Sequence, residues 1–287
     1  MARIDISGIG IEYELLGEVG NHAIVLNPGG RMSKDAPGMR EMADRLVAGG
    51  KRVLLWDRPN CGASDICFED DSESGLQGRI LAELIRALDL GPAAVAGGSA
   101  GSRTALQTAL HDPDIVSHLI PWWISGGTLS LLMLGASYYS EAAIAASMGG
   151  MEAVVALPIW SEQMSRNPRN RDIMLAMDAE DFIGRMGRWA ESFMPTEDSP
   201  VPGMLREDFA RLTMPTMIFR GSPKDLFHPA SIGEQVHHMI PGSELVDAPW
   251  TEEEFLHCTK EAARTGTGHF ANWHKLAPAI VEFTGRR

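Results

Sequence analysis

The sequence predicts an α/β fold: a mostly parallel eight-stranded sheet flanked by helices, with a helical segment inserted into it. Short apolar runs alternate with helical patterns up to about residue 125 and again from residue 215. Most of these runs are continuously apolar, as buried parallel strands are. Between them, residues 128–208 show helical patterns and no convincing strand. Strands and helices that alternate at this spacing imply a parallel sheet with helices on both faces.

The elements before the insertion begin with alternating segments at 3–7 and 9–17, which predict a hairpin around Gly8. Helix 39–50 is expected to end at Gly49-Gly50, and helix 74–88 has a leucine or isoleucine at every fourth position. The remaining elements expected here are strands at 22–30, 52–56, 93–98 and 116–125, and a helix at 101–112.

After the insertion, strands are expected at 215–221 and 243–249 and helices at 229–240 and 272–285. This divides the chain into a core of residues 1–127 and 209–287 and a helical cap of residues 128–208. Residues 248–268, between Asp247 and His269, have an acidic start and helical spacing. They suggest an extra surface helix, with solvated decoration, subunit contact or a place at the pocket mouth as its possible roles.

Composition excludes several classes of protein. The chain has 287 residues, 44% of them hydrophobic and 22% charged, and a formal net charge of −13. Nucleic acid and anionic membranes repel such a surface, so we expect neither as a partner. The uncharged stretch 119–140 contains Pro121 and Gly126-Gly127, which favour a buried strand followed by an apolar helix over a membrane span. Self-association into homo-oligomers stays open.

Cysteine usage and the first residues predict a cytoplasmic protein. Cys61, Cys67 and Cys258 are odd in number and lack metal-site spacing, as expected of free thiols in a reducing compartment. The start MARIDISGIG has no apolar region typical of a secretory signal. We predict no metal and no cofactor.

The turn Gly97-Gly98-Ser99-Ala100-Gly101, between an apolar run and a helix, carries the main chemical signal. It fits the pattern G-x-S-x-G, in which a strained strand-to-helix turn exposes a nucleophilic serine. Small residues two before and two after the serine prevent collisions across the bend. Nucleotide binding is the alternative, but the third glycine of a dinucleotide fingerprint and the Gly-Lys-Ser/Thr of a P-loop are absent.

With this turn, the chain resembles the α/β-hydrolase family. The segment PTMIFRGSPKDLFHP resembles the family's acid loop around Asp225, and TGTGHFANW places His269 just before the last helix. The segment DRPNCGAS resembles a structural turn of the family. The order nucleophile, acid, histidine is the family's order.

The resemblance implies a catalytic triad of Ser99, His269 and Asp225, in which the histidine takes the serine proton and the aspartate fixes the histidine tautomer. His228, close to Asp225, is the second candidate for the base. Asp247, at the end of the next strand, is the second candidate for the acid.

An oxyanion hole is expected from the N–H of Ala100 and from the loop LNPGGRMS. Pro28 has no N–H, so the second donor is Gly29 or Gly30. Arg31 could meet a substrate carboxylate, although a surface salt bridge is the preferred interpretation.

The cap holds nine of the 16 methionines. Such flexible apolar side chains suit an adaptable pocket, or they pack the cap helices together. The candidate substrate-binding aromatic residues in and around the cap are Trp123, Trp160, Trp189 and Phe270.

The resemblance therefore implies a serine hydrolase, of the carboxylesterase or lactonase type, that cleaves an ester or lactone of a bulky apolar small molecule. A hydrolase of C–C bonds in aromatic ring-cleavage products is one alternative, because GHFANW is similar to an ending found in those enzymes, with Phe270 in place of a tryptophan. A ligand-binding receptor on the same scaffold is another.

Overall fold

The computed structural model describes residues 1–196, 198, 200–266 and 268–286. Within them, one eight-stranded sheet has the order β1-β2-β4-β3-β5-β6-β7-β8. The hairpin of β1 and β2 is antiparallel, with Ile6 paired to Ile9, and β2 pairs antiparallel with β4. The six strands β3 to β8 run parallel to one another. The predicted fold class and hairpin are thus confirmed. The strands are β1 (Ala2–Ile6), β2 (Ile9–Leu16), β3 (Ala23–Asn27), β4 (Arg52–Trp56), β5 (Ala93–Gly98), β6 (Val116–Trp122), β7 (Met217–Arg220) and β8 (Glu244–Asp247).

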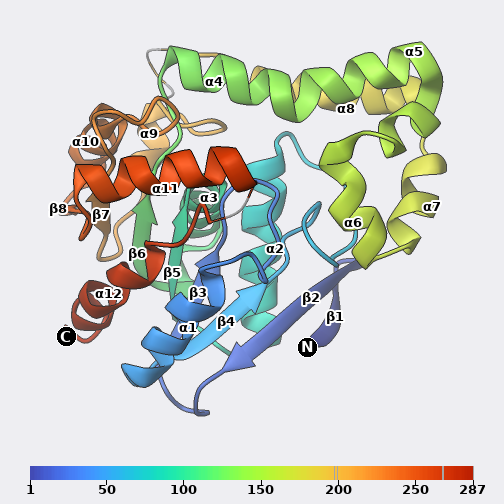
Figure 1. Cartoon of the computed structure of the whole chain (residues 1–287). Coiled ribbons are helices and arrows are strands. Elements are labelled where there is room, and N and C mark those ends of the chain that lie inside the picture. Colours follow the sequence, from blue (N-terminus) through green and yellow to red (C-terminus); the bar gives the residue numbers. More distant parts are fainter. Residues whose placement is uncertain (197, 199, 267, 287) are drawn as a thin grey trace.

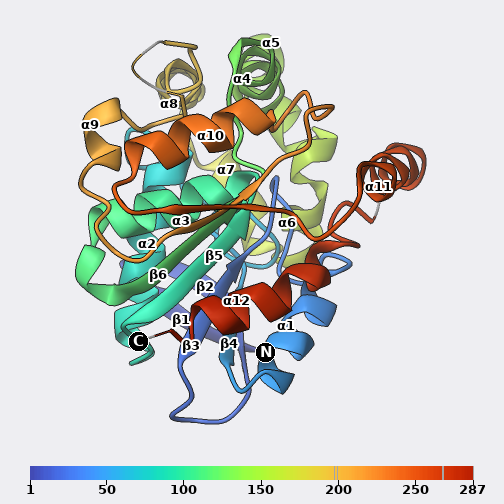
Figure 2. The same cartoon turned by 90° about the vertical axis from the view of Figure 1, so that its left-hand side faces the viewer.

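Helices cover both faces of the sheet. Successive residues of the buried strands point to opposite sides, so both faces carry apolar side chains. Ile24 and Leu26 pack with α1 (Met39–Ala48) and α12 (Ala277–Phe283) on one face (Figure 2). Val25 belongs to the opposite core, which includes residues of α2 (Glu73–Ala87), α3 (Ala100–His111) and α10 (Ala230–Met239). The uncharged stretch 119–140 forms the end of β6 and the start of the inserted helices.

The insertion between β6 and β7 lies along the top of the molecule in Figure 1 (α4, α5 and α8) and down its right-hand side (α6 and α7). Its described residues form helices and no strand. Phe182, Met186 and Trp189 of α8 are fully buried, and Phe68 of the core packs against this cluster. The elements of this region are α4 (Thr128–Gly135), a π-helical turn η2 (Ala136–Ser140), α5 (Glu141–Val155), a 3-10 helix η3 (Pro158–Trp160), α6 (Ser161–Arg166), α7 (Arg169–Leu175), α8 (Ala179–Glu191) and α9 (Arg206–Phe209).

The extra helix suggested by the sequence is present as α11 (Glu252–Thr265). Thr251 caps its first turn by accepting the N–H of Glu254, and Gly266 ends it in the left-handed conformation. Only Phe255 and Ala262 of the helix are buried, and Figure 2 shows that it stands off the sheet.

Candidate active site

The turn at Ser99 has the strained geometry that the sequence predicts. Ser99 lies between β5 and α3 with φ 57° and ψ −120°, a conformation that non-glycine residues rarely adopt. Its N–H donates to the carbonyl oxygens of Trp122 and Trp123 at the end of β6. The end of the neighbouring strand therefore fixes the backbone conformation of Ser99.

The glycines around Ser99 are required by close backbone contacts. A Cβ at Gly97 would lie 2.4 Å from the carbonyl oxygen of Gly101. A Cβ at Gly101 would lie 2.1 Å from the carbonyl oxygen of Asn27, at the end of β3. The collision at Gly97 is across the bend, as expected, whereas Gly101 is needed because α3 starts directly against the neighbouring strand.

The structure brings His228, and not His269, to the serine. The imidazole Nε2 of His228 is 2.8 Å from Ser99 Oγ, and its Nδ1 is 2.8 Å from Oδ2 of Asp225. The expectation that His269 hydrogen-bonds Ser99 is therefore corrected, and the second-candidate histidine takes this place. Asp247 is not in the group either: it forms an ion pair with Arg220 on β7.

A short turn in the chain explains why His228, and not His269, pairs with Asp225. Asp225 Oδ1 accepts the N–H groups of Phe227 and His228, which closes a short turn and returns the histidine to its own aspartate. The 14-residue helix α11 lengthens the link before His269. The three-residue spacing of Asp225 and His228 was the sequence signal for this arrangement.

The charge state of Asp225 suits the pair. Burial alone would raise the pKa of this carboxyl, but the hydrogen bond from His228, the charge of that ring and the two N–H donors together hold the pKa below its ordinary value. Asp225 therefore stays ionised at neutral pH and can orient the imidazole. Burial lowers the pKa of His269, which faces the same cavity as His228.

The loop after β3 approaches Ser99 through Gly29. A Cβ at Gly29 would lie 3.2 Å from Ser99 Cβ and from the ring of Phe270, whereas one at Gly30 would meet nothing closer than 3.9 Å. The guanidinium of buried Arg58 donates to the carbonyl oxygen of Gly30 at 2.6 Å and fixes the loop. Ala100, the first residue of α3, has an N–H that no carbonyl within the helix can accept.

Arg31 is part of a buried ion pair, which corrects the preferred interpretation as a surface salt bridge. Its Nε lies 3.1 Å from Glu73 Oε1, and its guanidinium stacks on the Trp160 ring with 4.4 Å to the centroid. Glu73 also accepts from Asn60 and from the Tyr139 hydroxyl. Burial alone would lower the pKa of Arg31, but Glu73 raises it, and the pKa of Glu73 is lowered in return.

The candidate substrate-binding aromatic residues divide into two groups. Trp123 lies against the site: its indole stacks on the His228 ring with 5.6 Å between centroids and 18° between planes. Trp160 and Trp189 are fully buried in the hydrophobic core, and neither lines the cavity beside His228. Phe270 is buried too, stacked on Trp273 behind Gly29, and acts as a support for the loop.

A cavity of about 250 Å³ lies beside the Asp225–His228 pair. Core residues and one face of α11 make its wall: Trp123, Asp225, Phe227, His228, His269, Phe255, Cys258, Thr259 and Ala263. Sequence reasoning missed the four α11 residues as wall residues, although it had considered the pocket mouth as one place for this helix.

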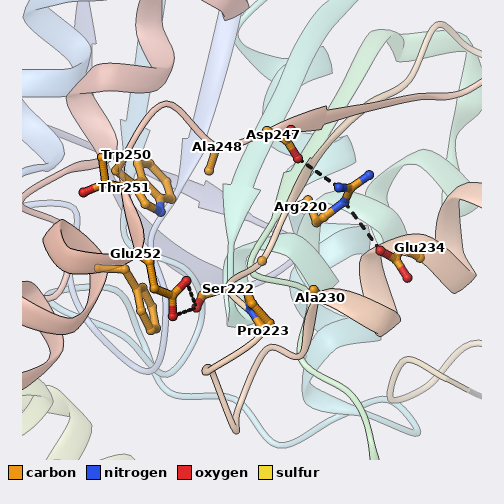
Figure 3. A pocket seen from close by; sticks show the side chains of 12 residues that line it. Arg220, Ser222, Pro223, Ala230, Glu234, Asp247, Ala248, Trp250, Thr251 and Glu252 are labelled. Carbon is orange, nitrogen blue, oxygen red and sulfur yellow. Dashed lines mark hydrogen bonds and ion pairs between the residues drawn. The ribbon is translucent and has the colours of Figure 1, made fainter.

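A second cavity of about 380 Å³, which shares Phe255 with the first, lies at the ends of β7 and β8 (Figure 3). Arg220 forms ion pairs with Glu234 and Asp247 there, and Ser222 Oγ donates to Glu252 at 2.9 Å. Neither Ser99 nor His228 lines it.

The three cysteines take part in neither a disulfide nor a group of metal-ligand type in the described residues. All three are free, and burial raises the pKa of the Cys61 thiol to about 12. In the part of the chain that the structure describes, no three His, Cys, Asp or Glu side chains are grouped so as to hold a metal ion.

Comparison with known proteins supports the fold and finds hydrolases of more than one kind. No family model matches the chain. A 2-hydroxy-6-oxononadienedioate/2-hydroxy-6-oxononatrienedioate hydrolase of Cupriavidus pinatubonensis is 40% identical over 83 residues, which cover 29% of this chain and only 28% of that enzyme. The human serine hydrolase BPHL is 24% identical over 257 residues, 85% of this chain and 77% of the relative.

Solved structures match along the whole chain. An α/β-hydrolase from a Medee basin deep-sea metagenome has a TM-score of 0.62 at 17% identity and covers 100% of this chain and 98% of its own. The enol-lactonase of Burkholderia xenovorans LB400 has a TM-score of 0.62 at 18% identity, with 99% and 100% covered. The fold resemblance inferred from the sequence is thereby confirmed.

Proposed function

Because the chain has the α/β-hydrolase fold, we propose that it is a serine hydrolase that cleaves a carboxylic ester or lactone of a largely apolar small molecule. The observation that carries the proposal is the continuous chain of hydrogen bonds from Ser99 Oγ through the His228 ring to Asp225. This is the geometry of an activated serine nucleophile. The names of the lactonase and serine hydrolase relatives support the same reaction class.

In the proposed reaction, Ser99 Oγ attacks the carbonyl carbon while Nε2 of His228 takes its proton. The N–H groups of Ala100 and of the Gly29-Gly30 segment stabilise the oxyanion, which in comparable sites contributes about 3 kcal/mol per donor. His228 then protonates the leaving oxygen, and an acyl group stays on Ser99. Water, deprotonated by the same imidazole, releases the acid.

Labelling with a fluorophosphonate tests the nucleophile directly. We expect one adduct on the intact protein and none on Ser99→Ala. Ser102 lies in the same tryptic peptide, Ala87–Arg103, so fragment spectra must place the adduct on Ser99, and Ser102→Ala serves as the matched control. An adduct that persists in Ser99→Ala, or hydrolysis of p-nitrophenyl esters and lactones that survives this change, contradicts the proposal.

Hydrolysis of a C–C bond is the second candidate, favoured by the name of the Cupriavidus relative. The assay is the loss of absorbance of 2-hydroxy-6-oxononadienedioate. If turnover of this compound depends on Ser99 and exceeds that of esters and lactones, the second candidate replaces the first.

A further inference from the structure

The cavity beside His228 lies where one of the two parts of an ester substrate, the acyl group or the alcohol, could bind. Its wall includes His228, Asp225 and Trp123, but not Ser99, Gly29 or Ala100, so it adjoins the histidine side of the site. Building on the proposed function, we propose that this cavity holds the leaving group, an apolar alcohol of aromatic size, and that α11 determines which alcohols fit.

The proton path assigns the leaving group to this side. When the tetrahedral intermediate collapses, the C–O bond to the alcohol breaks and its oxygen receives the proton that Nε2 of His228 took from Ser99. The leaving oxygen must therefore come within hydrogen-bond distance of that ring. The oxyanion and its donors belong on the Gly29 side of Ser99, outside this cavity.

The chemistry of the wall favours an uncharged aromatic group. Phe255, Cys258, Thr259 and Ala263 are spaced so that they lie on one face of α11. The Trp123 ring meets Phe255 edge-on, with 6.2 Å between centroids. The Asp225 carboxylate is occupied by His228 and two N–H groups, so it is not free to bind a cation. Such rings and apolar atoms suit a planar aromatic ligand.

One aromatic residue of the wall carries a hydrogen-bond donor that the described part of the protein leaves unpaired. Trp123 Nε1 is buried and has no partner among the described residues.

Although α11 stands off the sheet, it is fixed to the site at several points. Ser222, on the loop that carries Asp225, donates to Glu252 at the start of the helix. Asn272 Nδ2 donates to Cys258 Sγ at 3.2 Å, and Lys275 forms an ion pair with Glu254. These contacts fix the position of α11 relative to the loop that carries Asp225. Its side chains can therefore limit the size of the group that the cavity accepts.

The test is to fill the cavity from α11. Ala263→Phe adds a ring to the wall, and Lys260→Phe adds the same ring at an exposed position of the same helix outside the wall. The leaving-group series is methyl, phenyl and 2-naphthyl acetate; the acyl series is phenyl acetate, butyrate and hexanoate. We expect Ala263→Phe to lower kcat/KM for 2-naphthyl relative to methyl acetate by about ten- to 100-fold. The acyl-series ratios should stay as in the wild type, and Lys260→Phe should change neither series.

Two outcomes overturn the proposal in this assay: unchanged leaving-group ratios in Ala263→Phe, or a change confined to the acyl series. A binding measurement separates this failure from failure of the proposed function. In a Ser99→Ala background, 2-naphthol should bind and quench tryptophan fluorescence, more weakly with Ala263→Phe than with Lys260→Phe. Absent or equal binding overturns the cavity assignment, whether or not the wild type hydrolyses esters.

Discussion

The buried ion pair of Arg31 and Glu73 provides a sharp test of how the core holds the site loop. We consider Glu73→Gln, which keeps the shape of the side chain and removes its charge. The two side chains are 6% and 8% exposed, so Arg31 would be left buried beside a neutral amide. Its Nη1 already has no hydrogen-bond partner among the described residues, which leaves little to compensate the lost charge.

The size of the effect follows from this burial. Breaking a buried pair by removing one partner costs about 3–5 kcal/mol, because an uncompensated charge stays in the interior. That is a large part of the roughly 5–15 kcal/mol by which domains are stable. The exposed pair of Arg171 and Glu152, with side chains 50% and 70% exposed, is the matched control, and Glu152→Gln should cost less than about 1 kcal/mol.

Urea unfolding followed by circular dichroism measures both variants. The pKa of Glu73 is lower in the folded chain than its ordinary value of 4.5, so its contribution is fully present above that value. The contribution is lost as the pH falls through the folded-state pKa. The stability difference between wild type and Glu73→Gln should therefore be constant near neutral pH and shrink on acidification. An equal loss in the Glu73 and Glu152 variants would refute the reasoning.

Two further predictions concern the serine turn and the histidine. Gly101→Ala should fold poorly or lose several degrees of Tm, because its Cβ would lie 2.1 Å from the carbonyl oxygen of Asn27. The control is Gly187→Ala on α8, which has open space around it and should be neutral or stabilise the fold by up to about 1 kcal/mol. Equal thermal unfolding curves of the two variants would contradict this prediction. Trp123→Phe should keep the stack on His228, whereas Trp123→Leu should lower kcat/KM for p-nitrophenyl acetate by about two- to tenfold, and equal activity of the two variants would show that the stack does not position the ring.

The sequence was sufficient for the parts of the fold that depend on local patterns. Continuous apolar runs marked the buried strands, and the small residues around Ser99 marked the turn. The contact of Gly97 with Gly101 is local, whereas the need for a glycine at 101 arises from Asn27 on another strand. The extra helix before His269 was also visible in its acidic start and helical spacing. The strand and helix patterns can be recognised without knowledge of long-range packing.

The remaining site residues depended on contacts that the sequence does not display. Family order favoured His269, but the turn that returns His228 to Asp225 is closed by backbone N–H groups. Trp160 and Trp189 could have faced either a ligand or the core, and they are buried in the core. Arg31 lies 42 residues from its partner Glu73, so no local pattern could show that it is buried and paired.

The identity of the base is tested most directly by the rate at which a fluorophosphonate labels Ser99. The measurement compares wild type, His228→Ala and His269→Ala, with folding checked by circular dichroism. Removing a catalytic histidine lowers serine reactivity by orders of magnitude. We predict that His228→Ala slows labelling by about 10³-fold or more and that His269→Ala slows it by less than about tenfold. The opposite order, with His269→Ala as the inert variant, would contradict the proposed role of His228.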